Sequence, residues 1–142
     1  MTRQQVLFTW LTVINIPAFA QPLKVAQVPA VVRTAFANRY ASVTYVTWEK
    51  EKGNYEANWG GKSGEDFSAQ FTPSGDFIEL AEAMPVKDLP KAILDYCRIH
   101  YKTAISEAAR VTDAHSVHFY EVEMHGHDYI FDKDGNFVKK ED

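Results

Sequence analysis

The hydrophobic positions of the chain follow two periods, and the same succession of periods occurs twice. In residues 28–40 apolar side chains recur at spacings of three and four: Val28, Val31, Val32, Ala35, Phe36 and Tyr40. Residues 89–101 repeat this spacing: Leu89, Ala92, Ile93, Tyr96, Cys97 and Tyr101. Such spacing predicts amphipathic helices. Pro29 and Pro90 stand near the start of each pattern, where a missing N–H costs no helical hydrogen bond.

After each predicted helix the hydrophobic period changes from 3.6 to 2. In the first half apolar side chains alternate with polar neighbours in 46–48, 55–59 and 67–71. This alternation is typical of antiparallel strands with one covered face. In the second half the sequence predicts strands at 105–111, 117–124, 128–132 and 136–139. Turns rich in Gly, Asp and Asn separate the strands.

The two halves are copies of one unit, a helix followed by four short strands. Tyr-Glu-Ala at 55–57 reappears as Tyr-Glu-Val at 120–122, and the Phe-Gly-Phe spacing of 71–77 reappears at 131–137. One helix cannot cover four strands, whereas two helices can cover eight. We therefore predict an α+β fold in which two αββββ repeats, at about 28–83 and 88–141, form one antiparallel sheet of about eight strands with both helices on one face. Phe36, Trp48 and Trp59 are the expected core anchors.

The first twenty residues differ from the rest. Arg3 is their only charge, residues 6–16 are largely apolar, and Ala18-Phe19-Ala20 place small residues where signal peptidase reads them. This pattern predicts a signal peptide at 1–20, cleaved before Gln21, and a single domain at 21–142. A membrane anchor is the alternative, but the apolar stretch is about 15 residues long where a span needs roughly 20.

Composition and net charge limit the classes of partner that the protein can bind. Hydrophobic residues make up 46% of the chain, which suits a packed core. Without Arg3 the chain holds 14 Lys and Arg against 19 Asp and Glu, a net charge of −5. This balance argues against nucleic acid or an anionic membrane surface as partner, because both require a basic face. Cys97 is the single cysteine, so no intrachain disulfide can form.

Candidate chemistry is sparse. His125 and His127 flank Gly126 at a predicted hairpin tip, where two imidazoles could approach one metal ion. His115 or Asp128 would have to supply a third ligand, and a solvated turn is the simpler interpretation. The sequence has no nucleophile elbow, P-loop, His-Glu-x-x-His or dinucleotide motif. We therefore expect no cofactor and no enzymatic activity.

The strand positions out of phase with the core define a second, open face of the sheet. We expect the glutamates at these positions to face water: Glu49, Glu51, Glu56, Glu121 and Glu123. A pair of them could do acid/base work, but no spacing singles out such a pair. Phe119 shares their phase, and by the same parity Tyr45, Phe77 and Phe137 are expected to point away from the helices. Exposed aromatics on a sheet face mark a partner surface, unless they shield one another as cross-strand pairs.

Several motifs of the chain resemble those of the PepSY-like family. They are Val-Pro before the first helix, Val46-x-Trp48-Glu49-Lys50-Glu51, residues 53–57 and the Phe-x-x-x-Gly-x-Phe endings of the two halves. The resemblance spans residues 26–141 and departs where Trp48 has no aromatic counterpart near Arg110. It implies an exported bacterial protein of two such units, likened to beta-lactamase inhibitory protein, and a non-enzymatic role.

The sequence therefore predicts an exported, periplasmic or secreted binding module. It is expected to dock a protein or peptide of the cell envelope on the open sheet face through Tyr45, Phe77, Phe119 and Phe137, in the manner of an inhibitor. The alternative is a periplasmic metal-binding protein that uses His125 and His127.

Overall fold

The computed structural model describes residues 22–141, so the predicted signal peptide lies outside the described residues. The first repeat contains α1 (Ala30–Arg39), β1 (Thr47–Glu51), β2 (Asn54–Trp59), β3 (Phe67–Phe71) and β4 (Phe77–Ala83). The second contains α2 (Lys91–His100), β5 (Glu107–Asp113), β6 (His118–Met124), β7 (His127–Asp132) and β8 (Phe137–Glu141). A short 3-10 helix precedes each α-helix, at Val25–Gln27 and Val86–Asp88. The predicted succession of one helix and four strands, twice, is confirmed.

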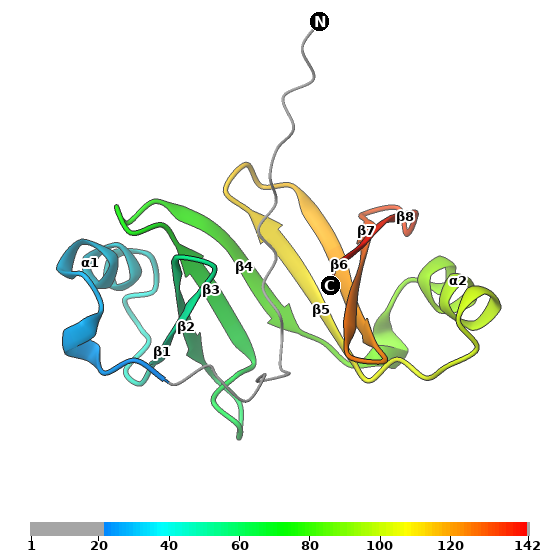
Figure 1. The fold of residues 1–142 in the computed structure, drawn as a ribbon, viewed down its shortest axis with the longest axis horizontal. Helices are drawn as coiled ribbons and strands as arrows, with labels where there is room; N and C mark the ends of the chain where they lie inside the picture. The colour runs from blue at the N-terminus through cyan, green and yellow to red at the C-terminus, as the bar shows by residue number, and fades with distance from the viewer. Residues whose placement is uncertain (1–21, 142) are drawn as a thin grey trace, which may run out of the picture.

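All eight strands belong to one antiparallel sheet in which each strand pairs with its neighbours in the sequence. α1 and α2 lie at opposite ends of the molecule with the strands between them (Figure 1). Residues that are paired on neighbouring strands lie on the same face of the sheet. One such row runs from Trp48 through Ala57, Ala69 and Leu80 into the second repeat. Both helices pack on this face, so the α+β prediction with two helices on one side of the sheet is confirmed.

The first repeat buries a cluster of aromatic rings under α1. Phe36 meets Trp48 and Trp59 edge to face, with ring centroids 5.4 and 5.2 Å apart. All three predicted anchors are buried. At ten residues α1 is too short to be stable in isolation, and this ring cluster therefore holds it on the sheet.

The second repeat uses different side chains for the same purpose. Ile93 and Cys97 of α2 pack on β5, β6 and β7. The rings here lie toward the last strands, because Tyr96 stacks on Phe137 at 5.2 Å and meets Phe131 at 5.4 Å. Neither helix of the described chain has the length and apolarity needed to cross a bilayer.

One glycine in each repeat allows a hairpin to touch a helix. Gly75, between β3 and β4, has φ +88°, and a Cβ there would lie 3.0 Å from the carbonyl oxygen of Val31 in α1. Gly135, between β7 and β8, has φ +84°, and a Cβ there would lie 2.9 Å from the Cβ of Ala92 in α2. Positive φ and close approach both favour glycine, which explains why this residue recurs in the two copies.

The sheet is strongly curved. β1 and β7 are six strands apart, which in a flat sheet would be roughly 29 Å, far beyond a screening length of about 8–10 Å. Nevertheless the charges of Glu51 and Lys52, at the β1–β2 turn, act on the carboxyl group of Asp128 in β7. The outer strands therefore bend toward each other on the side away from the helices.

Candidate functional site

The concave side of the sheet, which points away from α1 and α2, is here called the open face. Successive strand residues point to opposite sides. Because Trp48, Ala57 and Ala69 point toward α1, their neighbours Glu49, Glu56 and Gln70 point to the open face. The same phase continues through β4 to β8.

An apolar patch occupies the middle of the open face. It consists of strand residues alone: Ala81, Ala109, Val111, Phe119 and Ile130. Phe119 is the largest of them and is 9% exposed. The patch joins β4 of the first repeat to β5, β6 and β7 of the second, so the face is continuous across the repeat boundary.

A row of acidic and amide side chains crosses the open face beside this patch. In register from β1 to β5 it contains Glu49, Glu56, Gln70, Glu79 and Asp113. All but Glu49 are buried. Like charges directly opposite each other on a sheet are destabilising. The neutral amide of Gln70 separates the carboxyl groups of Glu56 and Glu79 and reduces this cost.

Glu56 corrects the expectation that the strand glutamates face water. It is 5% exposed, and its Oε1 accepts a hydrogen bond of 2.7 Å from the Ser68 hydroxyl, which also bonds Asn58. Burial raises the pKa of Glu56 to about 8, and the charges of Glu51 and Glu49 add to this effect. Glu121, the equivalent residue of the second repeat, is 2% exposed. The alternation pattern could indicate neither burial.

A second acidic row crosses the other end of the open face. In register from β5 to β8 it contains Glu107, Glu123, Asp128 and Glu141. Burial, followed by the charges of Glu123 and Glu141, raises the pKa of Asp128 to about 6. Burial and Glu123 raise the pKa of Glu107 as well. Burial and, after it, the neighbouring carboxylates favour the protonated form of these groups, and a cationic partner would favour the ionised form instead.

The solvent-accessible part of the open face is acidic. Its half-buried carboxylates come from both repeats: Glu49, Glu51, Glu107, Glu123, Asp132 and Glu141. Within residues 22–141, Lys139 is the one Lys or Arg at a strand position of this face, and it pairs with Glu141. The open face is thus an apolar patch inside a rim of carboxylates.

The four aromatics predicted for this face do not come together. Phe119 lies on the open face as predicted, and Tyr45 is 73% exposed but precedes β1. The predicted orientation of Phe77 and Phe137 is wrong, because both pack on the helix side, Phe77 against Phe71 and Phe137 against Tyr96.

A β-bulge is the cause in both repeats. The register shifts between Gln70 and Phe71, and again between Ile130 and Phe131. A bulge inserts one extra residue into a strand, so the side chains beyond it change face. Counting alternate residues along the sequence therefore predicts the wrong face for the side chains at the start of β4 and of β8.

The histidine turn joins β6 to β7. His125 is exposed in the β6–β7 turn with φ 55°, and His127 opens β7 opposite Met124. Among residues 22–141 no group of three His, Cys, Asp or Glu side chains is placed to hold a metal ion. The neighbouring aspartate of the calcium-like segment, Asp132, accepts hydrogen bonds from the backbone N–H groups of Asp134 and Asn136, as in a hairpin turn.

Sequence reasoning missed Glu56, Gln70, Glu79 and Glu121 as buried groups. One signal was available, since Glu56 and Glu121 occupy the same place in the two copies, in Tyr-Glu-Ala and Tyr-Glu-Val. No such signal exists for Gln70 or Glu79, whose repeat counterparts are Ile130 and Lys139.

The sequence profile of the family described as "Putative beta-lactamase-inhibitor-like, PepSY-like" matches residues 14–78 and 62–139. These matches cover most of the chain, and the chain therefore belongs to the PepSY-like family. The double match agrees with the tandem repeat. No curated protein matches the chain.

Solved structures share the fold. A protein from Bacteroides eggerthii, described as a "putative periplasmic" protein, superposes with a TM-score of 0.63 at 16% identity, over 80% of this chain and 87% of that one. A BLIP-like protein from Bacteroides fragilis superposes with a TM-score of 0.56 at 16% identity, over 80% and 84% of the two chains. At this identity the likeness concerns the fold alone.

Proposed function

We propose that this protein is an exported, non-enzymatic binding module of the bacterial envelope, and that its open face docks a basic protein or peptide. The carrying observation is the rim of half-buried carboxylates on the open face. The apolar patch inside this rim is only 0 to 9% exposed, so the carboxylates make the first contact with a partner. The acidic rim selects for Lys and Arg on the partner.

The comparisons support this proposal at the level of the fold. The family is described as beta-lactamase-inhibitor-like and one structural neighbour as BLIP-like, and both names associate this fold with holding another protein. The predicted signal peptide and a neighbour described as periplasmic support export. We infer the periplasm as the site of action and residues 21–142 as the mature domain.

The charge pattern adds a specific expectation. Burial and neighbouring carboxylates raise the pKa of Glu49 and Glu107, and that of Asp128 to about 6. A cationic partner would lower these pKa values, so docking should release protons and weaken as the pH falls from 7 to 5.

A charge-reversal experiment tests the face. The protein with Glu51→Lys and Glu123→Lys, one change in each repeat, is compared with a control carrying Asp88→Lys and Asp134→Lys. Both variants alter net charge equally, but the control residues are exposed in the 3-10 helix before α2 and in the β7–β8 hairpin. Crosslinked capture from the envelope of the exporting cell should fall at least about tenfold with the first variant and stay unchanged with the control. Equal capture by the wild type and both variants would show that the open face is not the docking surface.

A further inference from the structure

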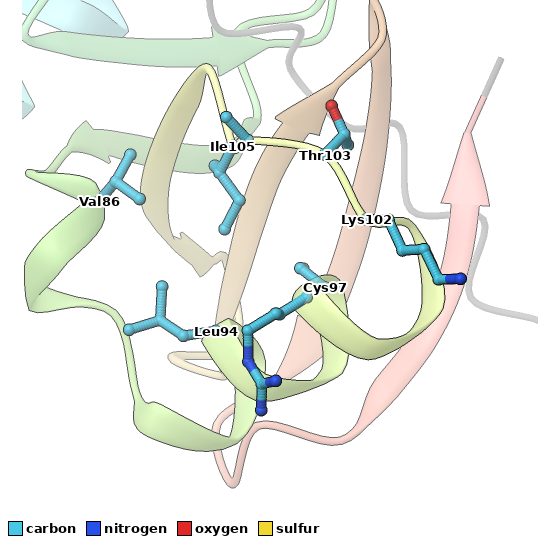
Figure 2. Close-up of a pocket in the computed structure, with 8 residues that line it drawn as sticks. Val86, Leu94, Cys97, Lys102, Thr103 and Ile105 are labelled. Carbon is cyan, nitrogen blue, oxygen red and sulfur yellow. The ribbon is translucent and has the colours of Figure 1, made fainter.

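A pocket of about 590 Å³ lies on the other side of the molecule, beside α2, away from the open face. Figure 2 shows Val86, Leu94, Ile105 and Cys97 around one space. These side chains come from the 3-10 helix before α2, from α2 itself and from the segment that leads into β5. The pocket is therefore formed entirely by the second repeat, and its floor is apolar.

The first repeat fills the corresponding place with rings. Phe36 occupies the α1 position that Cys97 occupies in α2, 61 residues later. In the first repeat the ring of Phe36 meets the ring of Trp48 at 5.4 Å. In the second repeat the thiol of Cys97 lines the pocket instead.

Backbone hydrogen bonds identify the counterpart of Trp48. The N–H of Leu23 donates to the Trp48 carbonyl oxygen at 2.7 Å, and the N–H of Met84, 61 residues later, donates to the carbonyl oxygen of Ala108 at 2.9 Å. Ala108 also pairs with Val122, as Trp48 pairs with Ala57. Trp48 is thus replaced by alanine, and Ala108 lines a smaller pocket beside Met84 and Ser106, which shares Val86 with this one.

The rings of the second repeat do not compensate on this side. Tyr96 and Tyr129 replace alanines of the first repeat; Tyr96 packs on Phe131 and Phe137, and Tyr129 of β7 meets Tyr101 at the end of α2 at 4.6 Å. The space near Val86 and Ile105 stays open. Unfilled apolar space in an otherwise well-packed protein is a cost that a ligand can offset.

The charged residues that line the pocket are both cations, Arg98 and Lys102, in a chain whose net charge is −4. Arg98 pairs with Asp95 at 3.5 Å, but both side chains are exposed, so this pair contributes little. Burial raises the pKa of the Cys97 thiol to about 11, and the floor stays neutral at physiological pH. An apolar floor with cations at the edge suits an anion that carries an apolar chain.

We propose that this pocket binds a small amphipathic carboxylate of the medium-chain acyl type. The chain would lie against Val86, Leu94 and Ile105. The carboxylate would lie at the edge beside Arg98, and the exposed side chain of Lys102, which extends away from Val86, Leu94 and Ile105 in Figure 2, would have to turn to reach it. This site is separate from the open face, and its existence does not depend on the proposed docking function.

The test is an ¹⁵N NMR titration of the protein with decanoate, using decanol and butanoate as probes that lack the charge and the chain length. Decanoate should bind with a dissociation constant below about 1 mM. The shifted signals should come from residues 86, 94, 97 and 102–105. Decanol and butanoate should each bind more weakly. Absence of saturable binding by decanoate at 1 mM, or shifts centred on the open face, would overturn the proposal.

Two variants and one control locate the interaction. Arg98→Gln with Lys102→Gln should weaken decanoate binding about threefold to tenfold, since each exposed cation contributes modestly. Lys87→Gln, an exposed neighbour outside the pocket, should leave it unchanged. Cys97→Phe, which copies the first repeat, should abolish binding.

The NMR spectrum and thermal melt of Cys97→Phe show whether it folds. A folded Cys97→Phe protein that binds decanoate as tightly as the wild type would refute the proposal. If Cys97→Phe does not fold, the charge variant decides, and unchanged affinity in Arg98→Gln/Lys102→Gln would refute it equally.

Discussion

Glu56 should make this protein less stable as the pH rises, and Glu56→Gln should remove that effect. In the folded state the carboxyl group has a pKa of about 8 against an ordinary value of 4.5, mainly because it is buried. A carboxyl group with a raised folded pKa favours folding fully below its unfolded pKa. That contribution is lost as the pH rises through the folded pKa, because the unfolded state ionises freely in water, whereas the folded state must either keep its proton or bury a charge.

The magnitude follows from the two pKa values. Each unit is worth about 1.4 kcal/mol, so the loss between pH 4.5 and pH 9 is on the order of 3 to 5 kcal/mol. Gln has the shape of the protonated acid, and its carbonyl oxygen can accept the hydrogen bond that Ser68 donates to Glu56. We therefore expect equal stabilities of wild type and Glu56→Gln near pH 5, and a variant more stable by roughly 3 kcal/mol or more at pH 9.

Urea unfolding monitored by tryptophan fluorescence measures this, because Trp48 and Trp59 are buried in the adjacent core. Between pH 7 and pH 9 the change in the free energy of unfolding is expected to come from the ionisation of Glu56. Asp128, with a pKa of about 6, has largely lost its proton by pH 7, and the Cys97 thiol, with a pKa of about 11, titrates above the interval. Asp134→Asn, at an exposed hairpin position, is the matched control. A wild-type stability that is flat or rises over this interval would refute the reasoning, as would a Glu56→Gln protein less stable than wild type at pH 9.

Two further predictions concern packing. Phe36→Ala should reduce the free energy of unfolding by about 3 to 5 kcal/mol. Val31→Ala, on the exposed side of α1, should change it by less than about 0.5 kcal/mol. Similar losses for the two variants in urea unfolding would contradict the assignment of the core. Gly75→Ala should cost at least about 1 kcal/mol more than Gly53→Ala, because both have positive φ but only the Cβ at 75 would meet Val31. Equal melting temperatures for the two glycine variants would argue against the contact between the β3–β4 hairpin and α1.

Much of the fold could be predicted because it depends on local patterns. A period of 3.6 after Val28-Pro29 and Leu89-Pro90, followed by alternation and turn residues, predicted both helices and the meander of strands. The recurrence of the unit then predicted two like halves in one sheet. The expected sharing of one interior by the two halves is wrong, because each helix covers the strands of its own repeat and the two helices lie at opposite ends of the molecule (Figure 1). The buried positions of Phe36, Trp48 and Trp59 follow from the same periodicity.

The candidate site could be predicted only in part. The open face itself and the place of Phe119 on it followed from strand parity. Phe77 and Phe137 were assigned to the wrong face, because a bulge changes parity without leaving a mark in composition. The alanine that replaces Trp48 could not be found from the sequence shift alone, because the shift of 61 that relates the helices leads to Ala109, whereas backbone pairing identifies Ala108.

The sequence by itself determined the elements, their order and the side of the sheet that each helix covers, since these depend on which residues are neighbours along the chain or across a short turn. Only the tertiary structure decided which polar groups are buried away from water. Glu56 and Glu121 occupy strand positions that alternation assigns to the solvent side, yet both are buried in the folded protein. Burial depends on side chains that strand pairing brings together from distant parts of the chain, so the burial of Glu56 and the raised pKa that follows from it are absent from any local pattern.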